Sequence, residues 1–84
     1  MTLYNLAKKI AEWVWNNGDR YELRDCYDSY EDFESETIMG MSNAEQRKGI
    51  AHYLRFTTFE TEEDDAYASK LWGMICDYER GIAK

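Results

Sequence analysis

The sequence predicts an all-α fold, a small compact bundle of about four helices in a single domain, residues 1–84. Apolar residues recur every three or four positions along most of the chain, which is the spacing of one helix face. Residues that commonly cap helices precede these segments. The 84 residues contain no proline, no linker rich in Gly and Ser, and no internal repeat.

The first expected helix begins after Thr2, whose side chain can cap it, and ends at about Asn17. Its apolar positions would share one face: Leu3, Leu6, Ala7, Ile10, Trp13 and Val14. Polar residues would occupy the opposite face: Asn5, Lys8, Lys9, Glu12 and Asn16. Gly18 then indicates a stop, and Asp19 a new cap.

A second helix is expected from about 20 to 34. Asp19 and Glu22 have the spacing of a capping box, with Asp in the place of Ser or Thr. The apolar positions after it keep a helical spacing: Leu23, Cys26, Tyr27, Tyr30 and Phe33. A short strand over 20–24 is the alternative, because apolar and charged residues alternate there.

The segment 35–41 is ambiguous and predicts at most a short extra turn that ends near Gly40. Met39 and Met41, on either side of this glycine, indicate a hydrophobic connection rather than an adaptable binding surface.

Ser42 and Glu45 form a capping box that opens a third helix, to about Phe56. Gly49 weakens this helix by roughly 1 kcal/mol relative to Ala, which suggests a close helix crossing at this position. Four residues of the helix are expected to point inward: Ile50, Ala51, Tyr53 and Leu54.

The last expected helix begins after Thr61 and continues to about Ile82. Four carboxylates in its first turn complement the helix dipole: Glu62, Glu63, Asp64 and Asp65. Its apolar stripe is the most regular in the chain: Tyr67, Leu71, Met74, Ile75, Tyr78 and Ile82.

The residues of common catalytic and metal sites are missing from the sequence. His52 is the only histidine, and it is expected on the flank of a helix. The segment 25–36 has the length of a calcium-binding EF-hand loop, but Tyr30 stands where that loop requires glycine. No glycine-rich phosphate loop is present. We therefore expect a protein that is not an enzyme and has no cofactor and no metal.

Charge, apolar runs and cysteine content limit the classes of partner and the compartment that we expect. Seventeen acidic and ten basic residues give a net charge of −7, which argues against direct binding of nucleic acid. The longest apolar run is about three residues, so no contact with a membrane is expected. Cys26 and Cys76 lack a paired spacing and are expected to be reduced, mostly buried thiols in the cytoplasm.

The acids concentrate in two segments. The first acidic cluster consists of Asp25, Asp28, Glu31, Asp32, Glu34 and Glu36. The second acidic cluster consists of Glu62, Glu63, Asp64 and Asp65, with Glu60 just before it. On one continuous helix, four members of the first acidic cluster would form a single stripe: Asp25, Asp28, Asp32 and Glu36.

Such a stripe has two interpretations. It can be a solubilising helix face, or it can imitate a row of backbone phosphates and bind Arg and Lys side chains that normally hold nucleic acid. Aromatic residues among the acids, Tyr27 and Tyr30 above all, favour a protein-binding surface with a charged rim. We therefore predict binding to a protein that has a basic, nucleic-acid-binding surface.

In composition alone (small, acidic, rich in aromatics, without catalytic residues) the chain resembles the inhibitor proteins that bacteriophages and mobile elements encode. These include anti-CRISPR and anti-restriction proteins, some of them DNA mimics. The resemblance covers no defined stretch and assigns no residue. It implies an inhibitor that acts in the cytoplasm, that of the host if a phage encodes it.

Two other functions compete with this prediction. Trp13 and Trp15 lie 200° apart on a helix, so Trp15 and Tyr4 could form the surface of a homodimeric structural or regulatory module. Alternatively, Trp, Tyr and the few Arg residues could line a pocket between helices for a small ligand or nucleotide.

Overall fold

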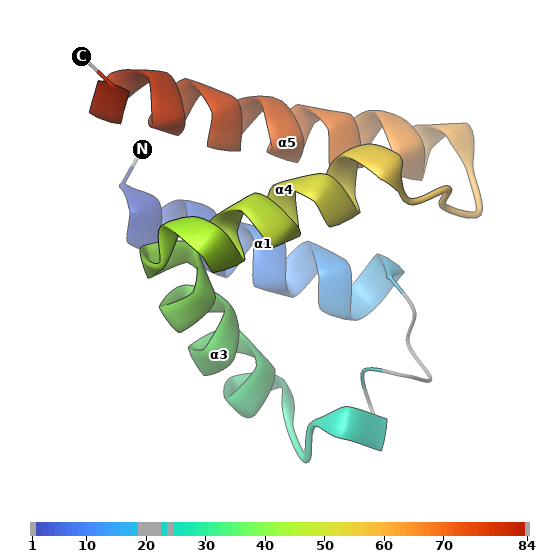
Figure 1. The fold of residues 1–84 in the computed structure, drawn as a ribbon. Helices are drawn as coiled ribbons and strands as arrows, with labels where there is room; N and C mark the ends of the chain where they lie inside the picture. The colour runs from blue at the N-terminus through green and yellow to red at the C-terminus, as the bar shows by residue number, and fades with distance from the viewer. Residues whose placement is uncertain (1, 19–22, 24, 84) are drawn as a thin grey trace.

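The computed structural model describes residues 2–18, 23 and 25–83, and its long elements are all helices (Figure 1). They are α1 (Leu3–Asn17), α3 (Tyr30–Ser42), α4 (Ala44–Phe56) and α5 (Glu62–Ala83). No strand occurs among the described residues. The predicted all-α bundle is therefore confirmed. The alternative strand over 20–24 lies almost wholly outside the described residues, and Leu23, its one described member, is helical.

Each helix packs against two others. α1 contacts α3 and α5, and α4 contacts the same two helices from the other side. Figure 1 shows α4 running between α5 and the upper end of α3. The packing buries a continuous apolar core: Leu6, Ala7, Ile10, Ala11 and Val14 of α1, Phe33 and Met41 of α3, Leu54 of α4, Phe59, and Ala68, Leu71 and Ile75 of α5.

Six predicted face residues of the first and last helices are buried: Leu6, Ala7, Ile10, Val14, Leu71 and Ile75. Five others are only partly buried: Leu3, Trp13, Tyr67, Met74 and Tyr78. Ala11 and Ala68 are buried without having been predicted, and the side chain of Ile82 lies outside the described residues.

Two predicted helix starts are confirmed by their capping hydrogen bonds. Thr2 Oγ1 accepts from the Asn5 amide at 3.1 Å. Thr61 Oγ1 accepts from the Asp64 amide at 3.0 Å. In both cases a side-chain oxygen satisfies one of the amides that a helix leaves without a partner in its first turn.

The predicted second helix has the wrong boundaries. Leu23, Asp25 and Cys26 are helical, but the helix is interrupted over 27–29. α3 begins anew at Tyr30 and continues to Ser42, so the ambiguous segment 35–41 forms most of α3. The physical reason is local, because Ser29 Oγ accepts from the Asp32 amide at 3.3 Å and so caps a new helix. The predicted capping box at 19–22 lies outside the described residues.

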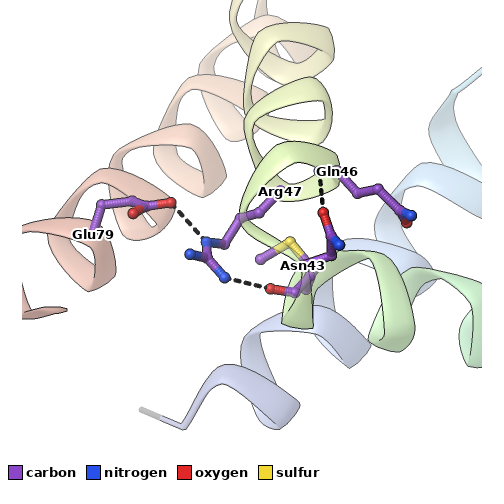
Figure 2. Close-up of polar contacts among 5 residues, drawn as sticks. Asn43, Gln46, Arg47 and Glu79 are labelled. Atoms are coloured by element: carbon purple, nitrogen blue, oxygen red, sulfur yellow. Dashed lines mark hydrogen bonds and ion pairs between the residues drawn. The ribbon is translucent and has the colours of Figure 1, made fainter.

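The corner between α3 and α4 also differs from the prediction. Asn43, not Ser42, caps α4, because its Oδ1 accepts from the Gln46 amide at 3.1 Å (Figure 2). Ser42 still belongs to α3, and its hydroxyl donates to the Ile38 carbonyl at 2.9 Å. Met39 and Met41 therefore lie on the last turns of α3 instead of a connection, Met39 exposed and Met41 fully buried.

The close helix crossing lies at Gly40 instead of Gly49. A Cβ atom at Gly40 would lie 3.1 Å from Gln46 Oε1 and 3.4 Å from Ile50 Cδ1. A Cβ atom at Gly49 would meet nothing within 4 Å. The expectation for Gly49 was wrong because low helix propensity alone does not reveal which glycine faces a neighbouring helix.

A buried arginine joins three helices (Figure 2). The Arg47 side chain on α4 is 7% exposed. Its Nε donates to Glu79 Oε1 on α5 at 2.6 Å, and its Nη1 donates to the Met41 carbonyl on α3 at 2.7 Å. The guanidinium also lies 5.3 Å from the ring centroid of Tyr78.

Replacing Arg47 with Ala is expected to lower the free energy of unfolding by about 2–4 kcal/mol, because it leaves the Met41 carbonyl unsatisfied and removes a buried side chain. Chemical denaturation measures the change. Arg80→Ala is the matched control, since the Arg80–Asp77 pair is exposed and worth at most about 1 kcal/mol. Equal losses in the two variants would contradict the role of Arg47.

Gly49→Ala is expected to stabilise the protein by up to about 1 kcal/mol, since α4 gains helix propensity without a clash. Gly40→Ala is expected to gain less or to destabilise, because Gln46 and Ile50 must move. Thermal melts of both variants test this, and a larger gain at Gly40 would refute the assigned crossing.

Candidate binding surface

The start of α3 positions the first acidic cluster. Glu31 and Asp32 lie in its first turn, where the positive end of the helix dipole stabilises carboxylates. Asp25 and Asp28 precede the helix, and both are exposed. Glu36 lies farther along α3 and is also exposed. The cluster thus spans a helical turn, a loop and two turns of α3.

This arrangement breaks the expected stripe. The non-helical residues 27–29 separate Asp25 and Asp28 from α3, so only Asp32 and Glu36 share a helix face. The prediction of a regular row of four carboxylates on one helix was therefore wrong. The cause is the cap at Ser29, which begins a new helix within the cluster.

Two members of the cluster face tyrosine hydroxyls. Tyr30 Oη donates to Glu34 Oε2 at 2.8 Å, and the Tyr30 ring packs edge-on against Trp15, with centroids 5.9 Å apart. Burial, together with this hydrogen bond, raises the pKa of Tyr30 to about 12. The half-buried ring is therefore fixed at both ends.

Tyr27 is held in a similar way. Its ring packs edge-on against Phe33, with centroids 5.1 Å apart. Burial raises the pKa of Tyr27, and the nearby Glu36 carboxylate raises it further. The two predicted aromatic anchors are thus partly exposed, and each lies close to a carboxylate of the first acidic cluster.

Within the described ranges, the first acidic cluster forms no ion pair. The two ion pairs found there are Arg47–Glu79 and Arg80–Asp77, both away from the cluster in sequence. The sequence places no basic residue between Arg24 and Arg47. The described part of the chain therefore leaves the charge of the first acidic cluster to solvent or to a partner.

The second acidic cluster lies in the first turn of α5. Asp65 Oδ1 accepts from the Phe59 amide at 2.8 Å, which fixes the connection from α4. Glu62 and Glu63 are exposed, and Asp64 is half-buried. Figure 1 shows the start of α5 at the upper right and the start of α3 at the bottom, with the end of α1 between them in this view. Consistently, α3 and α5 make no contact over their described lengths.

The residues predicted for a dimer surface differ in exposure. Trp15 packs against Phe33 as well as Tyr30, with the Phe33 centroid at 5.6 Å, so α3 covers this part of α1. Tyr4 is 54% exposed, and the Lys8 ammonium lies 5.3 Å from its ring centroid. Two other large apolar residues are exposed, Met39 and Phe56.

A pocket of about 670 Å³ lies between α1, α3, α4 and the side chains of Leu23, Cys26 and Tyr27. Its described lining consists of Ile10, Val14, Leu23, Cys26, Tyr27, Phe33, Glu36, Thr37, Gly40, Gln46, Gly49, Ile50 and Tyr53. Tyrosines were expected in such a pocket, but this lining contains no Trp and no Arg.

A pocket between helices was one alternative from the sequence, but its lining was not predicted, although α3 carried a signal. Phe33, Glu36, Thr37 and Gly40 recur at helical spacing and share one face of α3. These four residues can be recognised as one helix face only if the helix is taken to start at Tyr30 and to continue past Gly40.

The two cysteines and His52 belong to neither acidic cluster and occupy exposed or half-buried positions. Cys26 is exposed and Cys76 half-buried, and both are free, so the expectation of mostly buried thiols was wrong for Cys26. His52 is exposed, with its ring centroid 4.6 Å from that of Phe56. The described residues contain no group of three or more His, Cys, Asp or Glu that could hold a metal. None of the described helices combines the length and apolar character needed to cross a membrane.

The raised pKa of Tyr30 predicts a loss of stability in alkali. Its pKa in the folded state, about 12, exceeds the unfolded value of 10. The stabilisation is therefore complete below pH 10 and lost as the pH rises from 10 toward 12. Denaturation at two alkaline pH values should show a smaller loss for Tyr30→Phe than for the wild type. A phenolate titration with a Tyr30 pKa near 10 would contradict this.

Comparison with known proteins assigns no function to this fold or to these sites. No family model matches the chain, and no curated protein or solved structure matches it significantly.

Proposed function

We propose that the chain is a small acidic binding protein that inhibits a nucleic-acid-handling enzyme by occupying the enzyme's basic surface. The recognition surface is the first acidic cluster, with Tyr27 and Tyr30 as aromatic anchors. The observation that carries the proposal is that no described residue forms an ion pair with this cluster. In this proposal, inhibition requires only binding and no catalytic step.

The chemistry of the cluster supports this function. Arg and Lys side chains that bind phosphates also bind carboxylates, and Arg does so with two parallel hydrogen bonds. Asp25 and Asp28 are exposed and lie outside α3, so the helix does not require their charge. A net charge of −7 would speed the approach to a basic partner, with strong dependence on salt.

The second acidic cluster is a weaker candidate for the same partner. Its four residues complement the dipole of α5, and Asp65 holds the Phe59 amide, so the fold uses much of this charge. We include Glu62, Glu63, Asp64 and Asp65 only as a secondary contact. The proposal places the protein with phage or mobile-element inhibitors that act in the cytoplasm, where free thiols such as Cys26 and Cys76 persist.

The alternative is a homodimeric interaction module without inhibitory activity. Exposed Tyr4, Met39 and Phe56 favour it, because large apolar side chains in water often mark an interface. Packing of Trp15 against α3 weighs against the surface first expected for it. Sedimentation of the purified chain tests the alternative, since a monomer would exclude a homodimeric module.

The proposal is tested by reversing one charge in each acidic region. Asp28 and Glu60 are both exposed, and each immediately precedes the capping residue of a helix. Asp28→Lys and Glu60→Lys therefore change the charge equally at equivalent positions. Each variant is immobilised and exposed to a nuclease-treated cell lysate at low and high salt, and the retained proteins are assayed for nucleic-acid binding with and without the free chain.

We expect the wild type and Glu60→Lys to retain the same nucleic-acid-binding protein at low salt and to release it at high salt. That protein should lose its nucleic acid when the free chain is added. Asp28→Lys should bind it at least tenfold more weakly. Retention unchanged by Asp28→Lys, or retention of proteins without nucleic-acid-binding activity, would refute the proposal.

A further inference from the structure

The pocket between α1, α3 and α4 has the properties of a small-molecule site. Its volume of about 670 Å³ lies within the usual range of ligand pockets, about 300–1,000 Å³. Apolar side chains from each helix form its walls, among them Ile10, Phe33 and Ile50. The wall of the pocket is open at Gly49, because a Cβ atom there would meet nothing within 4 Å.

The polar groups of the pocket fix the charge of its ligand. Glu36 is the one charged side chain in the described lining, and its exposure places its carboxylate at the mouth. Tyr27 also lines the pocket, close enough to the Glu36 carboxylate for its pKa to be raised by it. The Thr37 hydroxyl is engaged within α3, where it donates to the Phe33 carbonyl at 2.9 Å.

We propose that this pocket binds a small apolar cation, an alkylammonium whose chain enters the pocket and whose charged end meets the Glu36 carboxylate. The apolar walls gain by covering a hydrocarbon chain. A carboxylate at the mouth attracts a cation and repels an anion. A nucleotide is disfavoured, since no described lining residue is basic. The pocket shares Glu36 and Tyr27 with the proposed recognition surface, but its binding of a small cation requires no protein partner and is tested without one.

Two free cysteines allow binding to be measured within one molecule. Cys26 lines this pocket, whereas Cys76 lies on α5, outside it. Alkylation of both thiols is followed by mass spectrometry with decyltrimethylammonium, decanol or decanoate, each below its micelle-forming concentration. Decyltrimethylammonium should slow the alkylation of Cys26 several-fold and leave Cys76 unchanged. Equal protection of both thiols, or of neither, would overturn the proposal.

Calorimetry with the same three probes tests the role of charge. The cation should bind roughly tenfold more tightly than decanol, and decanoate should bind more weakly than either. Glu36→Gln should remove most of this preference, since Gln keeps the size and a hydrogen-bond acceptor for Tyr27. Glu31→Gln is the matched control, because Glu31 is exposed on the same helix and does not line the pocket.

The control excludes a general effect of the acidic protein on cations. Equal weakening by Glu31→Gln and Glu36→Gln would refute a specific contact, as would equal binding of all three probes. Circular dichroism of both variants confirms that the fold is retained. A loss of helix in Glu36→Gln would instead show a structural role for Glu36, and the Cys26 protection in the wild type would then decide the proposal.

Discussion

The arrangement of α3, α4 and α5 depends on one buried cation. Carbonyls in the last turn of a helix have no partner within it, and the Met41 carbonyl of α3 is one of these. Arg47 donates to this carbonyl, places its charge at the negative end of the α3 dipole, and is neutralised by Glu79. One guanidinium therefore connects the last turn of α3 and the Glu79 side chain of α5 to α4. Because this end of α3 is fixed, the direction in which its acidic start projects is fixed as well.

The acids divide according to what the fold requires of them. Glu31 and Asp32 stabilise the first turn of α3, as the second acidic cluster does for α5. Glu34 accepts a hydrogen bond from Tyr30, and Glu36 lies near the Tyr27 hydroxyl, whose pKa it raises. Asp25 and Asp28 lie outside α3, are exposed, and form no ion pair with a described residue. They are therefore the members of the cluster most accessible to a partner.

Local chemistry explains which parts of the fold could be predicted. The starts at Thr2 and Thr61 combine a cap with an apolar period, and both were found. The break before Tyr30 was missed because the apolar spacing continues across it, so periodicity gives no signal of a new helix.

Asn43 and Ser42 are both good caps, and only the hydrogen bond from Ser42 back to Ile38 decides between them. Arg47 stands on the apolar face with Ile50 and Leu54, yet its partner Glu79 is 32 residues away, beyond any local pattern.

The same missed break explains both candidate sites. Because the helix is interrupted over 27–29, the regular carboxylate row is lost. The interruption also lets Leu23, Cys26 and Tyr27 join α1 and α4 in lining the pocket, where Tyr27 meets Glu36. The charge of the first acidic cluster is thus divided, with Glu36 at the pocket mouth and Asp28 on the open surface. Glu36 and Tyr27 belong to both proposed sites, but Asp28 does not line the pocket. Asp28→Lys therefore tests the protein-binding surface without altering the pocket.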